Sequence, residues 1–232
     1  MAIKINILKI MAVMFVVTLV MGAISATALP VYTDGAVDMY LKQNTFPSDL
    51  SEYQVFLDAD QAHTIIGHVG SQTGTPLVTF YSPTDILVAA NGFSTIKADD
   101  DYLNEITITA PGYWFEDLIF SVNLTGDENE EGDANTDLEV VAKDNSGITH
   151  SFSDWALGSG ENRILVLAQT GELMQSITIK SLIGLQEFGG IDQLKQTEIS
   201  GLTPVPEPAT MLLLGSGLLG LAGLGRKKFF KK

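Results

Sequence analysis

The sequence predicts an all-β domain over residues 29–203, an antiparallel two-sheet sandwich of the jelly-roll or immunoglobulin-like kind. The first observation behind this prediction is a period-two alternation of apolar and polar residues in many short segments. The second is that turn residues, mainly Gly, Asn and Asp, interrupt the alternation at intervals of about ten residues. The third is that long apolar stretches occur at the two ends of the chain, where they predict helices.

Residues 1–28 have the three parts of a secretory signal peptide. Two lysines and no acid lie in the first part, residues 10–24 are apolar, and Ala26 and Ala28 form the small-x-small pattern cut by signal peptidase. The alternative is an uncleaved membrane anchor, but about fifteen apolar residues are short for a membrane span. We therefore predict an N-terminal signal helix and cleavage after Ala28.

The middle of the chain alternates as strands with one buried face do. Turn residues at 144–147 and around 170–171 predict hairpins, and residues 163–167 are apolar on both faces, as in a central strand. One segment, residues 37–43, has a helical character. The predicted strands are SEYQVFLDA, TPLVTFY, LNEITITA, DLIFSVNL, DLEVVAK, ITHSFS, RILVLAQ and LMQSITIKS.

Charge and cysteine content exclude several function classes. Between Leu29 and Pro204 six Lys or Arg residues stand against 27 Asp or Glu residues, a balance of −21. Such a surface repels phosphate, so nucleic-acid binding is excluded and cations or neutral polymers remain as partners. The chain has no cysteine, which excludes thiolate zinc sites, cysteine nucleophiles and a need for disulfides.

The sequence predicts no catalytic residues and therefore a protein that is not an enzyme. A G-x-G-x-x-G pattern at 215–220 lies inside the apolar tail, with neither the strand nor the acid that a nucleotide site requires. No serine lies in a nucleophile elbow. His63 and His68 are five residues apart, which places them on opposite faces of a strand, and we expect the histidines to lie at the surface or in turns.

One acidic loop suggests calcium, the one cofactor that the sequence leaves open. Asp127, Asn129, Glu131 and Asp133 occupy positions 1, 3, 5 and 7 of a calcium-loop pattern, but Leu138 stands where the bidentate Glu belongs. The alternative is a solvated acidic loop. The aromatic run Tyr113-Trp114-Phe115 also allows two interpretations, packing in the core or a surface that stacks on sugars, and alternation favours the core.

The last part of the chain, residues 204–232, has three sections. Three prolines within 203–208 prevent helix and central strand and leave an extended linker. Residues 210–225 are apolar and predict a marginal transmembrane helix, weakened by glycines. The basic cluster Arg226, Lys227 and Lys228, with two further lysines, holds this end in the cytoplasm and places the acidic domain on the other side of the membrane.

This tail resembles the PEP-CTERM sorting signal of Gram-negative bacteria, with Pro206, Glu207 and Pro208 at the motif that gives the signal its name. The resemblance implies that an exosortase, a membrane protease, removes the tail. It also implies export through the inner membrane, a membrane-anchored precursor, and display at the surface or release from cells that make exopolysaccharide. Two stretches, ITITAPGYWFEDLIFSVNL and GGIDQLKQTEISG, look like the β-rich ectodomains of unknown function that precede such tails.

Two function classes follow for the acidic domain. The first is a structural or adhesive protein of the cell surface or of an exopolysaccharide (biofilm) matrix. The second is a carbohydrate- or calcium-binding module of that matrix. The expected partners are signal peptidase, an exosortase, exopolysaccharide and, transiently, the inner membrane, whereas the ligand, the cleavage point in the tail and the oligomeric state are left open.

Overall fold

The structure is a computed structural model that describes residues 32–41, 46–47, 52–124, 138–153, 157, 160–169, 171–182, 190–206 and 213–219. These residues form strands and one short helix over residues 213–219, so the all-β prediction is confirmed. Residues 37–41, where the sequence suggested a helix, form a strand instead, because their buried positions belong to a sheet rather than to a helix face. The strands are β1 Tyr32–Asp34, β2 Val37–Leu41, β3 Tyr53–Leu57, β4 Asp60–Ala62, β5 Thr64–Val69, β6 Leu77–Tyr81, β7 Leu87–Ala89, β8 Gly92–Phe93, β9 Thr95–Ala98, β10 Glu105–Thr109, β11 Tyr113–Trp114, β12 Asp117–Leu124, β13 Leu138–Asp144, β14 Thr149–Phe152, β15 Gly160–Ala168, β16 Met174–Ser181, β17 Ile191–Ser200 and β18 Thr203–Pro204.

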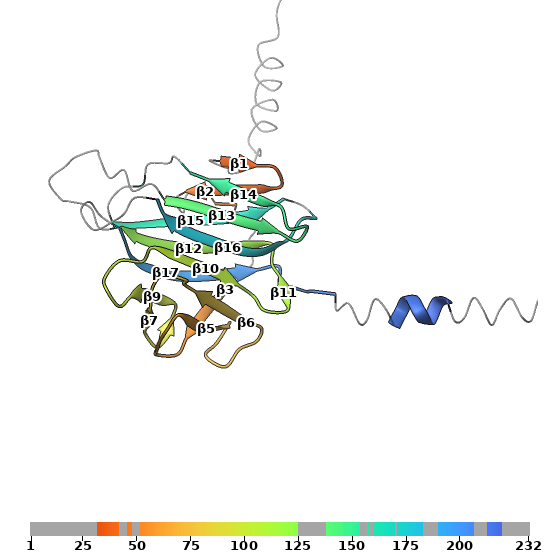
Figure 1. Cartoon of the computed structure of the whole chain (residues 1–232), viewed down its shortest axis with the longest axis horizontal. Coiled ribbons are helices and arrows are strands. Elements are labelled where there is room, and N and C mark those ends of the chain that lie inside the picture. Colours follow the sequence, from red (N-terminus) through yellow and green to blue (C-terminus); the bar gives the residue numbers. More distant parts are fainter. Residues whose placement is uncertain are drawn as a thin grey trace, which may run out of the picture.

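The strands join into one curled antiparallel sheet and one small separate pair. The hydrogen-bonded path runs β1-β2-β15-β12-β17-β3-β5-β6-β10-β16-β13-β14, with β4, β7, β8 and β9 attached beside β17 and β3. In Figure 1 the first and last strands of this path, β1 and β14, lie next to each other, so the sheet is nearly closed like a barrel. The sequence predicted a sandwich of two sheets, whereas nearly all the strands belong to one sheet. Alternation identifies the inner face of a strand but not the strands that lie next to it, so it could not distinguish the two arrangements.

The core lies inside the curled sheet and follows the predicted alternation. Ile106 and Ile108 of β10 are fully buried, and so are Leu118 and Phe120 of β12. They belong to one continuous cluster of aliphatic and aromatic side chains from nearly every strand of the sheet. Burial of each such side chain stabilises the fold by about 1.5–3 kcal/mol, which explains how the domain forms without disulfides.

One outer face of the sheet is also covered. Tyr40, Ile119 and Leu165 lie on the outside of β2, β12 and β15 and are 4%, 1% and 0% exposed. Phe46 packs against them, and the Arg163 guanidinium lies 5.9 Å from the centre of its ring. The prediction that residues 163–167 form a central strand with two apolar faces is therefore confirmed.

β17 joins the two halves of the sheet through a bulge. Along one edge it pairs with β12, and along the other it pairs first with β9 and then with β3. Ile119 and Ser121 are two residues apart on β12, yet they face Glu198 and Lys195, which are three apart on β17. β17 therefore has one extra residue at this point, and Gln196 within the bulge has a left-handed conformation with φ of 50°. Such a bulge bends a strand and increases its twist.

Ser94 holds this bulge in place. The Ser94 carbonyl accepts a hydrogen bond from the Gln196 amide at 2.8 Å, and its hydroxyl accepts one from the Thr197 amide at 2.6 Å. Its own amide donates to the carbonyl of Val55 in β3 at 3.0 Å. Ser94 is only 1% exposed, so one buried residue satisfies the backbone of the bulge and connects it to the next strand.

We expect Ser94→Ala to lower the free energy of unfolding by about 1–3 kcal/mol, because it leaves the buried Thr197 amide without an acceptor. Ser71→Ala, in an exposed loop, is the matched control and should change stability by less than about 0.5 kcal/mol. Urea unfolding of both variants measures the difference. Equal stability of the two would show that the bulge does not depend on the serine hydroxyl.

Candidate functional site

The point where the C-terminal tail leaves the domain is a small sheet of its own. In this sheet Tyr113 of β11 pairs with Pro204 of β18, and Trp114 pairs with Thr203. The Val205 amide then donates to the Gly112 carbonyl at 2.9 Å. The predicted boundary between residues 203 and 204 thus falls within a strand, and the fold continues to Val205. In Figure 1 the tail leaves the domain beside β11.

β11 is fixed to the core by the residue that follows it. Phe115 is fully buried and exchanges two backbone hydrogen bonds with Met174, at 3.0 and 2.7 Å. Tyr113 and Trp114 are half-buried, with Tyr113 packed on the edge of the core. Core packing, the prediction that alternation favoured for this aromatic run, is confirmed for Phe115. Its two neighbours hold the base of the tail.

Gly201 allows the chain to turn from β17 into β18. Its φ is +62°, a left-handed conformation that glycine adopts without strain. A Cβ at this position would overlap the Cβ, Cγ and Cδ atoms of Glu116. Sequence reasoning did not single out Gly201, Gly112 or Val205, because a two-residue strand carries no alternation pattern.

The structure describes few of the residues that the sequence predicted for sorting. Pro206 is exposed and directly follows the last hydrogen bond of the tail base. The structure does not describe the residues predicted for the rest of the motif, the basic cluster, signal cleavage and calcium, so those predictions remain open. They are Glu207, Pro208, Arg226, Lys227, Lys228, Ala26, Ala28, Asp127, Asn129, Glu131 and Asp133.

The comparisons with known proteins identify the tail. Residues 204–227 match the family model of the PEP-CTERM protein-sorting motif. No curated protein and no solved structure matches the chain. The match supports an exported protein that an exosortase processes and that is displayed at the surface from a membrane-anchored precursor. It carries no information on the function of the β domain.

The described part of the predicted transmembrane segment is short. Residues 213–219 are helical, and Leu213, Leu214, Leu218 and Leu219 are between 59% and 76% exposed. Among the residues that the structure describes, no helix has both the length and the apolar character to cross a membrane. The transmembrane helix over 210–225 therefore stays a prediction.

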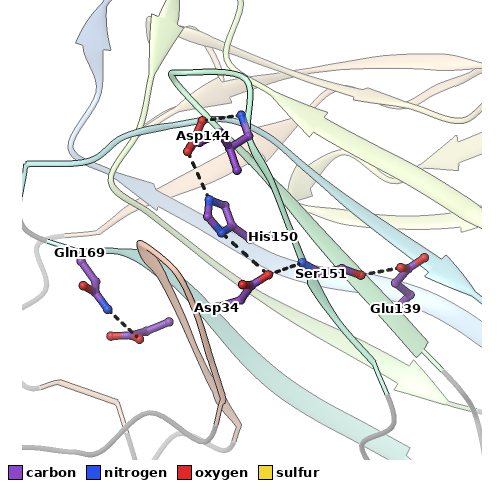
Figure 2. Close-up of polar contacts among 8 residues, drawn as sticks. Asp34, Glu139, Asp144, His150, Ser151 and Gln169 are labelled. Carbon is purple, nitrogen blue, oxygen red and sulfur yellow. Dashed lines mark hydrogen bonds and ion pairs between the residues drawn. The ribbon is translucent and has the colours of Figure 1, made fainter.

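Besides the base of the tail, a cluster of polar side chains lies where the sheet nearly closes, at the contact of β1 and β14. Figure 2 shows His150 between two carboxylates: its Nε2 is 3.3 Å from Asp144 Oδ2, and its Nδ1 is 3.9 Å from Asp34 Oδ2. The same Asp34 oxygen accepts a hydrogen bond from the Ser151 amide at 3.1 Å, and the Ser151 hydroxyl donates to Glu139 at 2.6 Å. His150 is 5% exposed, so the expectation of a surface histidine was wrong here.

The arrangement of this site is that of a structural clamp. Asp144 Oδ1 accepts the amides of Ser146 and Ile148 and so shapes the predicted turn. Burial raises the pKa of Asp144, but these amides and His150 outweigh burial, and its pKa is lowered from the ordinary value. Its carboxylate therefore stays charged beside His150. The Ser151 hydroxyl bonds to Glu139 rather than to the imidazole.

The other two histidines are also placed by structural contacts. Nδ1 of His63 and Nδ1 of His68 each lie 3.2 Å from a backbone carbonyl, those of Ser82 and Gly74. Within the described residues no three His, Asp or Glu side chains gather as metal ligands would.

A buried acid lies on the covered outer face of the sheet. Asp117 is 1% exposed and accepts a short hydrogen bond from the Ser200 hydroxyl at Oδ2, whereas its Oδ1 has no hydrogen-bond partner among the described residues. Burial raises the pKa of Asp117 to about 6; the bond from Ser200 opposes this and the charge of Glu116 adds to it. The ion pair between Arg163 and Glu198, at 2.6 Å, does not include Asp117.

We expect the wild-type protein to lose stability as pH rises through about 6, because the fold favours protonated Asp117. The contribution is fully present below the ordinary pKa of 3.8 and lost above about 6, and amounts to about 3 kcal/mol. Asp117→Asn should therefore match the wild type at pH 4 and exceed it at pH 8. Urea unfolding across this range tests the difference. A stability difference between Asp117→Asn and the wild type that stays constant from pH 4 to pH 8 would contradict the prediction.

We expect Gly201→Ala to loosen the base of the tail. The left-handed backbone costs a non-glycine residue about 1–2 kcal/mol, and overlap with Glu116 adds to this. Gly171→Ala is the control, because Gly171 also has positive φ, of +91°, but has open space around it. Thermal melting and limited proteolysis near residues 203–206 should show the larger effect for Gly201→Ala. Identical effects would mean that the close approach to Glu116 is immaterial.

Proposed function

We propose that this chain is the precursor of a structural protein of an extracellular, exopolysaccharide-containing matrix. The observation that carries the proposal is the PEP-CTERM match at 204–227, which begins within the folded domain at β18. The proposal includes signal peptidase cleavage after Ala28, a transmembrane helix over 210–225 that anchors the precursor in the inner membrane, and removal of that helix by an exosortase. The product would be the acidic β domain alone.

Several properties of the domain support a structural role. It carries −21 charges between Leu29 and Pro204, which favours solubility and resists self-association. It contains no cysteine, so folding outside the cell needs no oxidation. Each of its histidines contacts a backbone carbonyl or carboxylates. We propose on these grounds that the protein is not an enzyme.

The second candidate is a binding module of the same matrix. Calcium binding by the loop of Asp127, Asn129, Glu131 and Asp133 stays a prediction, because the structure does not describe that loop. Carbohydrate binding is favoured by one specific observation, a hydroxyl-rich and uncharged outer face on β6, β10 and β16. The two roles are compatible, since a matrix protein that binds its polysaccharide is both.

We expect the mature protein in the native host to begin near Leu29 and to lack residues 211–232, because each end is a handling signal. The cut should fall after Val205, since the preceding residues are paired with β11 and a protease requires an extended, unpaired chain. Intact-mass measurement of protein from the medium or the cell surface tests both ends. The variant Glu207→Ala should accumulate with its tail in the membrane fraction. Wild-type protein outside the cell that still carries the basic tail would exclude exosortase processing.

A further inference from the structure

The outer face of β6, β10 and β16 carries a regular grid of hydroxyl groups. Across these three strands Tyr81, Thr107 and Thr178 stand in one row. Thr79, Thr109 and Ser176 stand in the next row, directly beside the first. We name these six residues the hydroxyl face.

The hydroxyl face is exposed because the same strands turn their apolar residues inward. Ile106 and Ile108, which alternate with the two threonines of β10, are fully buried. Tyr81 is 45% exposed, and the other five side chains are half-buried by their neighbours in the sheet. The opposite outer face is different, since Phe46 packs there against Tyr40, Ile119 and Leu165. Within the part of the chain that the structure describes, the hydroxyl face is therefore the outer face that solvent reaches.

The hydroxyls of this face are only partly used in hydrogen bonds among the residues that the structure describes. Thr107 and Thr178 bond to each other at 2.9 Å. In the part of the chain that the structure describes, Thr79, Thr109 and Ser176 make no side-chain hydrogen bond. Each hydroxyl is both a donor and an acceptor, so the grid presents unsatisfied capacity of both kinds.

The hydroxyl face is free of charge in a strongly acidic domain. The nearest charges on the same side are Glu105, Lys180 and Glu139, which stand in register in the adjoining row and alternate in sign, and Lys143 beside Ser176. The grid therefore neither attracts cations nor selects an anionic polymer. Apolar side chains flank it on the β5 side, where Ile66 is 40% exposed, and at the start of β6, where Leu77 is 39% exposed.

We propose that the hydroxyl face binds a neutral polysaccharide chain. An extended sugar chain offers hydroxyl donors and acceptors at regular intervals, and neighbouring strands repeat the grid every 4.7–4.9 Å, with side chains on one face about 6.6 Å apart along each strand. The exposed ring of Tyr81, with the exposed Ile66 opposite Thr79 in the next row, supplies the apolar surface that the face of a sugar ring packs against. The inference rests on the proposed function, in which the domain lies within exopolysaccharide.

Affinity electrophoresis of the protein purified from its native host tests this proposal, with dextran, hydroxyethylcellulose or the host's own exopolysaccharide in the gel. Tyr81→Ala should weaken retardation by about tenfold, the loss expected for one aromatic contact. Thr109→Glu, which places a charge in the centre of the grid, should abolish it. Tyr53→Ala, at a 58% exposed tyrosine of β3, and Thr73→Glu, in an exposed loop, are the matched controls and should bind as the wild type does.

The outcomes separate the alternatives. Selective loss in the two face variants, with circular dichroism and melting temperature unchanged, supports the proposal, as does retardation that salt does not alter. Retardation in none of the three gels, equal retardation of all variants, or binding confined to anionic alginate overturns it. Sedimentation that shows a dimer broken by Thr109→Glu also overturns it, in favour of an interface between two copies. The intact-mass measurement on the same samples judges exosortase processing separately, so the face can fail while the sorting conclusion stands.

Discussion

The bulge in β17 is the feature on which the rest of the fold depends. A strand in a flat sheet has one neighbour on each edge, but β17 has β12 along one edge and β9 followed by β3 along the other. The bulge at Gln196 bends the strand at the point where its partner changes, and the backbone and hydroxyl of Ser94 satisfy the amides that the bend leaves unpaired. This bend helps the sheet to curl until β1 reaches β14, and the curled sheet encloses a single continuous core.

The buried acids Asp85 and Asp117 differ in the number of hydrogen-bond donors around them. Burial raises the pKa of Asp85, but bonds from Asn104, Thr84 and the Glu105 amide outweigh it, so its pKa is lowered and it holds the loop before β7 to β10 as a charged anchor. Asp117 is buried with one hydroxyl donor, and its pKa is raised. The number of donors therefore decides which buried carboxylate strengthens the fold at neutral pH and which weakens it.

The match to the sorting motif and the folded β domain overlap at β18. The match to the PEP-CTERM motif begins at residue 204, which is also the last residue of a strand that the domain holds against β11. Because Phe115 anchors β11 in the core, folding of the domain fixes the position from which the tail emerges. Val205 donates to Gly112 the last backbone hydrogen bond between the tail and the β domain in the part of the chain that the structure describes, and Pro206 after it has no amide to donate.

Local patterns in the sequence determined the class of this protein. Alternation identified the inward residues of strands such as β10 and β16, turn residues located the hairpin at 144–147, and the order of prolines, leucines and lysines identified the tail. These features depend on neighbours in the chain, so one sequence is enough to recognise them. The tertiary structure alone decided which strands lie side by side, since strand pairing joins residues as distant in the chain as Tyr53 and Ile199 and period two is the same for every partner. For that reason the single curled sheet, the clamp of Asp34 on His150, the strand at the base of the tail and the hydroxyl face all became visible only when distant strands were placed in register.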